Sequence, residues 1–523
     1  MIEPQTQTRD FWVSAFTLSD LDVEQIYNHF LEVGRPQTTS ELTKTVMAYR
    51  VAEERNELRR RLAGRIVYQP NKRFNVGDEL VFPALQFAYG TVTGIRPGHN
   101  PQYEQFNVIT VDLSGKTREF AADLQTDHLL NQDNGMRTDP VVEVDVQQLY
   151  DRFGPAVEEK IAESLRLHPE FISLAGHWLV KSLMVSVSIG HLHLAEAVLE
   201  VNEGGPLPTD DIMKHLDLDS SADTSVQRFS LNDALLHDGR FDEVAPAGKV
   251  AWFLRRMEPE SVQQPPERLR YTPIPYDRAL LGPQLLALER ELDDEWSNLE
   301  SSGTAQPVVL CIIYPHLVTG TLPLSARTRP LFPLGKSPRL QIDFVDEHTG
   351  HRIPAWVVKE HRYIYGFKEW FETNNIPIGG FLTLKPAAEP GVVLLGYDRR
   401  RAQREWVRMA TVADGHVKFD LQRRTISCGY DDLLIVGSDT ITALDLLRRR
   451  IEMNQWSLAT ILAEIFPDLA KLIPQNAVHA KTLYSAVNML RRVTPGPLFA
   501  ELVRHPAFHP VGDHYWQFDS TRL

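Results

Sequence analysis

Cysteine and long apolar runs are both scarce in this sequence. Of its 523 residues, only Cys311 and Cys428 carry a thiol. Two cysteines cannot build a disulfide framework or a thiolate metal cluster, and such low usage is typical of a reducing compartment, so we expect a cytoplasmic protein. No apolar run is long enough to cross a bilayer, and the N-terminal stretch MIEPQTQTRDF lacks the basic and apolar regions of a signal peptide. We therefore expect no membrane partner.

Positive charge is also in deficit. The formal net charge is -14, which disfavours a general polyanion binder, because non-specific affinity for nucleic acid needs a positive surface. Local basic faces remain compatible with this balance. The length of the chain predicts roughly three to five domains.

Recognisable catalytic motifs are absent as well. The sequence has no phosphate-binding glycine loop before a helix, no G-x-S-x-G elbow and no H-E-x-x-H helix. Side chains that can ligate a metal or assist hydrolysis do gather in one stretch: Asp343, Asp346, Glu347, His348 and His351. A strand ending in a polar hairpin turn is the simpler interpretation of that stretch. We predict a protein that is not an enzyme and has no cofactor or bound metal, with a metal-dependent nuclease as one alternative.

One motif occurs three times: an apolar helical stretch, a phenylalanine, a polar turn and a tryptophan. The copies run from His168 to Val180, from Asp238 to Leu254 and from His505 to Asp519. Both aromatic rings can face one side of a hairpin that is too small to be stable without packing on the preceding helix. We therefore predict three winged-helix units, whose structural wing pairs are Phe171 with Trp178, Phe241 with Trp252, and Phe508 with Trp516.

The second copy carries additional features. Leu207-Pro208-Thr209 precedes a helix, Asp238-Gly239-Arg240-Phe241 opens the hairpin, and Trp252-Phe253-Leu254-Arg255 closes it. On these residues, the segment 181–257 resembles the HARE-type helix-turn-helix found in the delta subunit of bacterial RNA polymerase, in chromatin factors and fused to restriction enzymes. The acids near its candidate recognition helix would repel phosphates, so we expect this copy to contact protein or act as a scaffold.

Two regions have the period-two pattern of strands. Residues 66–135 predict a small closed barrel, and VGDELVFP followed by GTVTGI resembles SH3-like barrels; we expect a spacer or a protein contact. A larger β-rich block covers 305–438. There, a G-x-x-x-W-F helix ending in Trp370-Phe371, followed by an N-x-x-x-G entry to the next strand, resembles the DNA-binding pseudobarrel of plant transcription factors and restriction-enzyme effector domains. Gly380 stands where that family has an acid.

The larger block also contains a run of arginines around one tryptophan. The predicted nucleic-acid contacts are Arg399, Arg400, Arg401, Arg404 and Trp406, and Arg408, Arg423 and Arg424 are nearby. Arginine beside an aromatic ring can hold phosphates while the ring stacks on a base. Solvated strand edges are the alternative, since acidic residues dilute the run and charge at an edge also prevents aggregation.

The C-terminal unit has the clearest helix-turn-helix pattern. On a helix expected over Val478–Arg492, Leu483, Val487 and Leu490 form the buried stripe. Five polar side chains are expected off that stripe, where they could contact base edges or phosphates in the major groove: Lys481, Ser485, Asn488, Arg491 and Arg492. A helix face that is merely soluble is the alternative.

These patterns together predict an α+β multidomain protein with tandem winged-helix units, an SH3-like small β-barrel and a larger β-pseudobarrel. The predicted segments are an N-terminal helical domain (1–65), the small barrel (66–135), a winged-helix-like unit (141–180), the HARE-like winged helix (181–257), a linker (258–279), a connecting helix (280–300), the pseudobarrel (305–438) and the C-terminal winged helix (441–523). We predict binding of double-stranded DNA through the C-terminal winged helix and the second barrel, in transcription regulation or defence against foreign DNA. The alternative is a protein-interaction scaffold associated with RNA polymerase or another nucleic-acid machine. The oligomeric state stays open.

Overall fold

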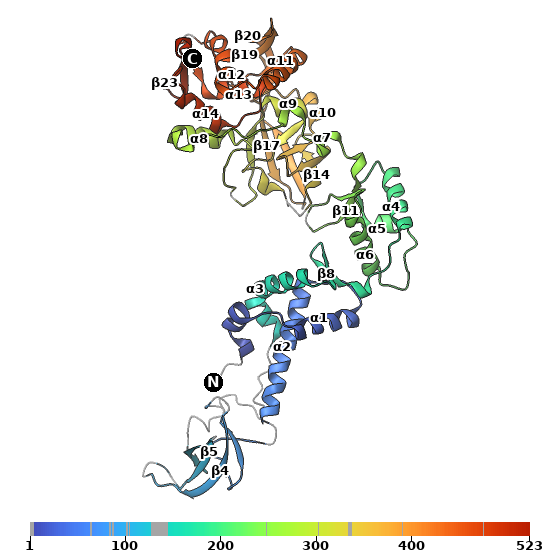
Figure 1. Ribbon diagram of the computed structural model, residues 1–523, viewed down its shortest axis with the longest axis vertical. Helices are drawn as coiled ribbons and strands as arrows, with labels where there is room; N and C mark the ends of the chain where they lie inside the picture. The colour runs from blue at the N-terminus through green and yellow to red at the C-terminus, as the bar shows by residue number, and fades with distance from the viewer. Residues whose placement is uncertain are drawn as a thin grey trace. The chain divides into compact units, whose positions relative to one another are not determined.

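The computed structural model describes residues 5–62, 65–82, 85, 88–100, 103, 105–113, 115–126, 145–246, 248–301, 303–332, 337–389, 391–473 and 475–523. The chain mixes helices with several separate sheets, in agreement with the predicted α+β class (Figure 1). It divides into two compact units, one made of residues 1–186 and 218–233 and the other of residues 187–217 and 234–523. Within the described ranges, the helices are too short or too polar to cross a membrane.

One arrangement of elements occurs three times in the chain. Each copy runs helix, short strand, helix, helix and hairpin, and the short strand pairs antiparallel with the second strand of the hairpin. We call each copy a helix–hairpin module. The three sheets have the strand orders β1-β8-β7, β9-β11-β10 and β22-β24-β23.

The first module joins two segments that the sequence had separated. Its elements are α1 (Asp20–Val33), β1 (Gln37–Thr38), α2 (Thr39–Leu62), α3 (Val146–Leu167), β7 (Phe171–Leu174) and β8 (His177–Val180). Gln37 pairs with Trp178 across the small sheet, so the predicted division into domains at 1–65 and 141–180 is wrong. The hydrophobic pattern shows where each helix begins, but it does not show which strand the short β1 joins.

A five-stranded sheet lies in the chain between α2 and α3. Its strands are β2 (Ile66–Val67), β3 (Glu79–Phe82), β4 (Ala88–Pro97), β5 (Asn107–Leu113) and β6 (Lys116–Ala122), in that order. Leu80, Val92 and Ile109 lie in its core, each almost fully buried. The predicted strands of this segment are confirmed as far as residue 126, and residues 127–135 lie outside the described ranges.

The second module is divided between the two units. Its elements are α4 (Ile189–Val201), β9 (Leu207–Pro208), α5 (Thr209–Met213), α6 (Thr224–His237), β10 (Phe241–Glu243) and β11 (Ala251–Leu254). The part of α6 up to Asp233 belongs to the first unit, where Val226 and Phe229 are buried in the core. The predicted segment 181–257 is therefore not a separate compact domain.

The segment after the second module packs against the protein rather than extending as a linker. It contains α7 (Glu260–Gln263) and α8 (Pro283–Leu292). Val262 and Leu269 are buried in a cluster with side chains of the following sheet. The predicted connecting helix is shorter than expected, because Asp293 adopts a left-handed conformation (φ 44°) that ends α8.

A seven-stranded sheet follows, in the order β12-β17-β18-β14-β15-β16-β13. Its strands and helices are β12 (Val308–Cys311), α9 (Tyr314–Thr319), β13 (Thr321–Pro323), β14 (Arg339–Asp346), β15 (Arg352–Val358), β16 (Tyr363–Tyr365), α10 (Lys368–Thr373), β17 (Phe381–Pro386) and β18 (Val392–Tyr397). All pairs are antiparallel except β14 with β18. Alternating apolar residues such as Leu340, Ile342 and Phe344 face its core.

A separate sheet is formed by β19 (Arg399–Ala413), β20 (His416–Cys428) and β21 (Gly437–Ser438). The predicted block 305–438 therefore contains two sheets rather than one barrel. Residues Asp432–Val436, between β20 and β21, form a turn and loop beside β19. Both long strands of this sheet are drawn in orange in Figure 1.

The third module completes the chain with α11 (Ile441–Met453), α12 (Leu458–Ala470), β22 (Val478–His479), α13 (Ala480–Leu490), α14 (Pro495–Arg504), β23 (Phe508–Gly512) and β24 (Tyr515–Phe518). Its core is continuous with neighbouring elements, since Leu288 of α8, Tyr314 of α9 and Phe419 of β20 belong to the same buried cluster. Helix α12 runs through Pro467 and ends at Ala470.

In each of the three hairpins, the phenylalanine of the predicted pair lies on the first strand and the tryptophan on the second. Each phenylalanine and tryptophan is buried, with at most 6% of its surface exposed. The Trp178 indole donates a hydrogen bond to Thr39 Oγ1 at 3.0 Å, and the Trp252 indole donates to Thr209 Oγ1 at 3.2 Å. In the third module Ala480 takes that position, and the buried Trp516 indole has no partner among the described residues.

Candidate nucleic-acid interface

The two long strands β19 and β20 form a ribbon with two different faces. A two-residue turn joins them, in which Asp414 (φ 55°) and Gly415 (φ 74°) both adopt the left-handed conformation that such a turn requires. Because side chains alternate along a strand, the pairing register assembles one polar face. We call it the ribbon face; its residues are Arg404, Trp406 and Arg408 on β19, opposite Thr425, Arg423 and Leu421 on β20.

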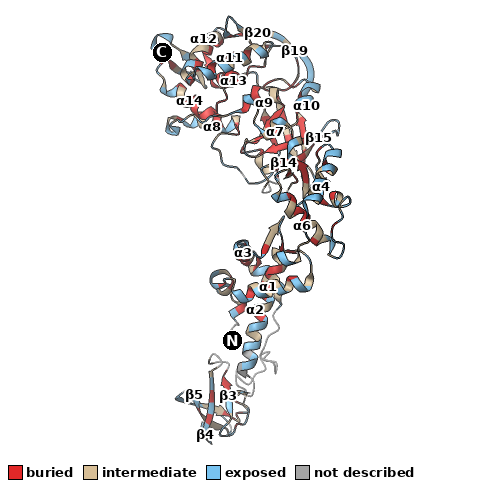
Figure 2. Cartoon of the chain, turned by 45° about the vertical axis from the view of Figure 1, so that its right-hand side comes forward, coloured by how far each residue is buried: buried red, intermediate tan, exposed pale blue. Residues whose placement is uncertain are grey.

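The opposite side of the ribbon explains why this register is stable. Val407, Met409 and Ile426 are buried there, together with Val436 of the following loop. A slip of one residue would bring these apolar side chains into water and turn the arginines inward. Burial on one side therefore fixes the other side as a solvent-facing surface, and Figure 2 shows most of this long ribbon as exposed.

The ribbon is held at both ends. At its turn, His416 Nδ1 lies 2.5 Å from Glu464 Oε1 and Lys418 Nζ lies 3.5 Å from Asp468 Oδ2, both on α12. At its open end, the Gly429 N–H donates to the Asp398 carbonyl at 2.7 Å. A strand pair anchored at both ends presents its central side chains with little loss of conformational freedom on binding.

The ribbon is basic in an acidic protein. Residues 399–428 contain eight Lys or Arg and three Asp or Glu, a net charge of +5, whereas the whole chain carries -14. Some of these cations are neutralised: Arg400 pairs with Asp398 at 2.7 Å, and Arg424 pairs with Asp439. Arg408 donates to the Asp432 carbonyl.

Four arginines of the ribbon are exposed and have no carboxylate partner within the part of the chain that the structure describes: Arg399, Arg401, Arg404 and Arg423. Guanidinium groups of this kind present several N–H donors in a fixed fork that matches phosphate oxygens. The structure therefore brings together four of the predicted nucleic-acid contacts, namely Arg399, Arg401, Arg404 and Trp406, on one ribbon. Arg400 lies beside them but is already paired.

Trp406 is the most unusual side chain of this surface. Of its surface, 66% is exposed, and directly opposite it lies Arg423. Leu421, diagonal to it on the ribbon face, is 44% exposed. An open indole flanked by guanidinium groups can stack on a base while the cations hold phosphates.

The sequence analysis named Arg423 and Arg424 near the arginine run, but it did not pair the two strands into one surface. Arg423, Thr425 and Leu421 complete the ribbon face. The signal was present in the Asp414-Gly415 turn, because counting outward from a two-residue hairpin places Trp406 opposite Arg423.

Helix α13, by contrast, does not present the predicted recognition face. Every residue of α13 except Lys481 is buried. Lys481 Nζ itself lies 2.5 Å from Glu291 Oε1 and 2.8 Å from Asp431 Oδ2, and Ser485 Oγ accepts a hydrogen bond from the Ile435 N–H at 3.0 Å. The prediction that these side chains are exposed is wrong, because other elements cover the whole helix.

The other three predicted contact residues, Asn488, Arg491 and Arg492, also bind other parts of the protein. Asn488 is buried and donates to the Tyr484 and Val493 carbonyls, and Arg491 donates to the Trp456 carbonyl at 3.0 Å. The Arg492 side chain is 1% exposed, and its Nη2 lies 2.6 Å from Asp294 and 2.7 Å from Glu295. None of these five side chains is placed to contact DNA.

The buried ion cluster at Arg492 has shifted pKa values. Burial works against the charged carboxylates, yet the Arg492 guanidinium and His316 hold the pKa of Glu295 well below its usual range. Burial, aided by the nearby charge of Glu295, raises the pKa of Asp294. The two carboxylates raise the pKa of Arg492 despite its burial. The cluster therefore keeps its arginine charged and fixes α13 to the turn after α8.

The predicted metal-ligand candidates are occupied by structural contacts. Asp346 accepts backbone N–H bonds from His348 and Thr349, and an indole N–H bond from Trp370 at 2.6 Å. Asp343 pairs with Arg352, and Glu347 with Lys385; His351 follows in the same turn. The described residues contain no group of three or more His, Cys, Asp or Glu arranged to hold a metal. These contacts fit the polar-turn interpretation.

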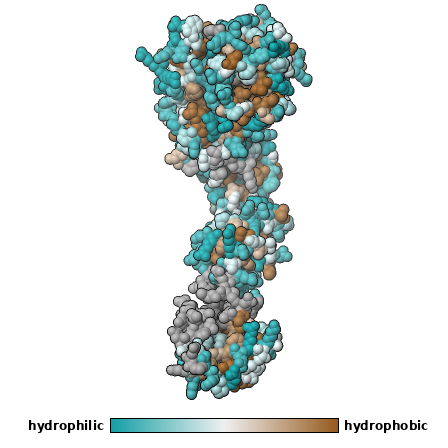
Figure 3. Space-filling view, turned by 90° about the vertical axis from the view of Figure 1, so that its left-hand side faces the viewer, coloured by the Kyte–Doolittle hydropathy of each residue, from teal (hydrophilic) through white to brown (hydrophobic). Residues whose placement is uncertain are grey.

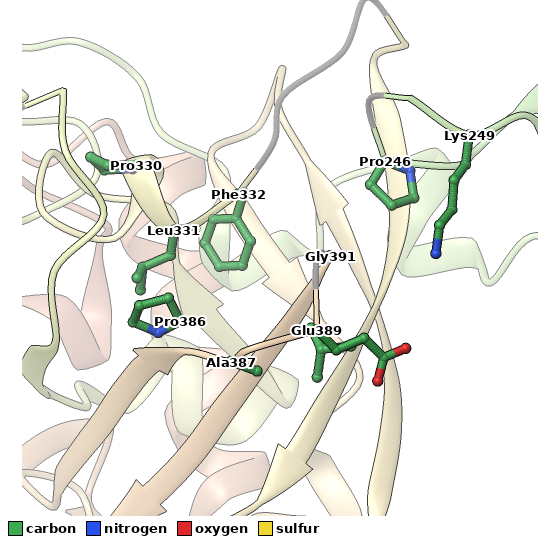
Figure 4. A pocket seen from close by; sticks show the side chains of 10 residues that line it. Pro246, Lys249, Pro330, Leu331, Phe332, Pro386, Ala387, Glu389 and Gly391 are labelled. Carbon is green, nitrogen blue, oxygen red and sulfur yellow. The ribbon is translucent and has the colours of Figure 1, made fainter.

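A cavity of about 320 Å³ lies elsewhere in the second unit, at the ends of β17 and β18. Its lining is Pro246, Lys249, Pro330, Leu331, Phe332, Pro386, Ala387, Glu389, Gly391 and Val392 (Figure 4). Glu389 pairs with Arg352 at 2.6 Å, and apart from Lys249 the rest of the lining is apolar. Lys249 is the one cation among these lining residues, whereas the ribbon gathers several exposed arginines.

The surface of the second unit is otherwise mixed in character. Figure 3 shows hydrophilic side chains interspersed with apolar patches on its visible face. Comparisons with models of protein families, with curated proteins and with solved structures found no match.

Proposed function

We propose that the protein binds DNA through the ribbon face, with Arg399 and Arg401 at the open end of the ribbon as additional contacts. The observation that carries this proposal is a set of four exposed arginines beside an exposed tryptophan, on a ribbon anchored at both ends. Within the described ranges, these four arginines have no carboxylate partner. A two-stranded ribbon is also one of the elements that the major groove of DNA admits.

Charge distribution supports the same proposal. Outside the ribbon the chain is strongly acidic. The whole chain has a formal net charge of -14 and residues 399–428 have +5, so the remaining residues together carry -19. Phosphates are repelled by such a surface and attracted by the ribbon, which limits binding to one orientation. The resemblances of residues 181–257 and 305–438 to DNA-associated families support a role in transcription regulation or in defence against foreign DNA.

The test is the affinity for a short DNA duplex, measured by fluorescence anisotropy over a series of salt concentrations. We expect wild-type binding to weaken as salt rises, because each neutralised phosphate releases counterions. The double variant R404E/R423E should lose most of this binding, and the salt slope should fall by about two units. Arg400→Glu is the matched control on the same strand; because Arg400 is already paired with Asp398, its effect should be smaller. A wild-type protein without salt-dependent binding would contradict the proposal.

We also propose that the three helix–hairpin modules are winged helices, with the third serving as a structural element. Their helix–strand–helix–helix–hairpin order and three-stranded sheets support this. In the third copy the two helices after β22 are mostly buried, so neither has a free face for a groove. A DNA-binding role for the C-terminal unit would require α13 or α14 to leave the core.

A protein-scaffold function is the second candidate, and α4 favours it. Ile189, Leu194 and Val201 on this helix are 63%, 49% and 84% exposed. Exposed apolar side chains along one helix are typical of a protein contact. The scaffold function predicts that L194E/V201E, and not R404E/R423E, abolishes recovery of a bound protein from a lysate.

A further inference from the structure

We infer that the ribbon face recognises an unpaired base in DNA, with the Trp406 ring as the stacking platform. This inference rests on the proposed DNA binding and specifies the nucleic-acid class. Its starting point is that Trp406 is the one exposed tryptophan of the nine in the chain, all of which the structure describes. Trp296 and Trp456 are partly buried, and the other six are buried.

The Trp406 ring has no structural role that would explain its position. Of the other eight tryptophans, seven make a ring–ring or cation–ring contact or donate to a named acceptor, as Trp370 does to Asp346, and Trp516 is buried. Among the described residues Trp406 has no such partner. A large apolar ring left 66% exposed on an anchored ribbon loses the favourable free energy of burial, unless a ligand covers it.

The cations around Trp406 are spaced for a nucleotide. Arg404 and Arg408 lie two residues away on either side, roughly 7 Å along the strand, because a strand rises about 3.3 Å per residue. Arg423 lies directly opposite. A base stacked on the indole would therefore have its flanking phosphates within reach of guanidinium groups from both strands.

This arrangement suits an unpaired base better than an intact duplex. Inside a duplex the faces of the bases are covered by their neighbours, and the grooves present only base edges. Against an edge, tryptophan offers a single N–H donor and no acceptor. An unpaired base presents its face at no cost of unpairing, whereas a paired base must first be extruded. Stacking is also tolerant of base identity, since every base has an aromatic face.

The experiment compares three DNA probes by anisotropy: a short duplex, the same duplex with one unpaired nucleotide at its centre, and the single strand. We expect the two probes with unpaired bases to bind about tenfold more tightly than the duplex. Trp406→Ala should remove this preference, so that all three probes bind with similar affinity, and Trp406→Phe should keep part of it. Because Trp406 is exposed, both variants should fold normally, which thermal unfolding checks.

A spectroscopic signal separates stacking from general attraction. With 2-aminopurine as the unpaired base, wild-type protein should quench its fluorescence on binding, and Trp406→Ala should not. If all three probes bind equally and R404E/R423E weakens all of them, the inference is wrong while the proposed DNA binding stands. If no probe binds the wild-type protein, both fail.

Discussion

The ribbon β19–β20 and the segment Ala480–Arg492, which contains α13 and the two arginines after it, carry similar side chains. Both have arginines and short polar residues, and both belong to the same unit of the chain. Arg404 is exposed and has no carboxylate partner among the residues that the structure describes, whereas the Arg492 side chain is 1% exposed and contacts two carboxylates. The difference shows that a cluster of cations becomes a candidate binding surface only where the fold leaves it unpaired. The same residue type in the interior holds two segments of the protein together.

The largest expected effect is on the free energy of unfolding, when the buried Arg492 and the exposed Arg404 are each replaced. Arg492→Ala leaves Asp294 and Glu295 buried without their cation, and we expect it to lower the free energy of unfolding by about 3–5 kcal/mol. Arg404→Ala removes an exposed side chain, and we expect a change within about 0.5 kcal/mol. Denaturant unfolding of the full chain, followed by tryptophan fluorescence, measures both. Equal stability of the two variants would contradict the assignment of Arg492 to a structural role.

A smaller effect is expected from His479, which lies at the start of α13. Burial, together with the nearby charges of His514 and Lys481, lowers the pKa of His479 from 6.5 to about 4. The folded protein therefore keeps the imidazole neutral, so its contribution to stability is complete above pH 6.5 and is lost as the pH falls towards 4. The loss should amount to at most about 3 kcal/mol.

His479→Asn tests this contribution to the pH dependence. His479 Nδ1 accepts a hydrogen bond from the Lys481 N–H at 3.1 Å, and an asparagine oxygen can take over this capping role. We expect the variant to match the wild type at pH 7 and to lose less stability between pH 6.5 and pH 4.5. Parallel pH profiles for the two proteins would show that His479 does not titrate as proposed.

The smallest effect concerns the three tryptophans of the hairpins. The Trp178 and Trp252 indoles donate to threonines, whereas the Trp516 indole has no partner among the described residues because Ala480 replaces the threonine. We expect Ala480→Thr to supply the hydrogen bond and to raise stability by about 1 kcal/mol. The reverse change in the second module, Thr209→Ala, should lower stability by a similar amount. Thermal unfolding of both variants checks the pair, and destabilisation by Ala480→Thr would show that the third module has no room for the hydroxyl.

The features that could be predicted from the sequence are those specified by neighbouring residues. The three hairpins follow from a phenylalanine, a turn and a tryptophan within a short stretch, and most strands of the seven-stranded sheet follow from alternation such as Leu340, Ile342 and Phe344. The arginine-rich segment was recognised for the same reason. The Asp414-Gly415 turn would also have given the register of the ribbon.

Contacts between distant segments could not be predicted in this way. The helical period of α13 identified Leu483, Val487 and Leu490 as one buried stripe, but its other side is covered by elements remote in sequence. Arg492 meets Asp294, 198 residues away, and no local pattern indicates that pairing. The first module likewise depends on the pairing of Gln37 with Trp178, on either side of an inserted sheet.

The most direct test of the central claim is to locate DNA on the protein with a fluorescent thiol label. Burial raises the pKa of Cys311 to about 12 and that of Cys428 to about 11, so neither native thiol should react readily. Thr425→Cys places a label on the ribbon face, and Ala197→Cys places one on an exposed position of α4. We expect DNA to change the fluorescence of the label at position 425, with the same dissociation constant as in anisotropy, and to leave that at 197 unchanged. A response at 197 without one at 425 would contradict the ribbon face as the DNA-binding surface.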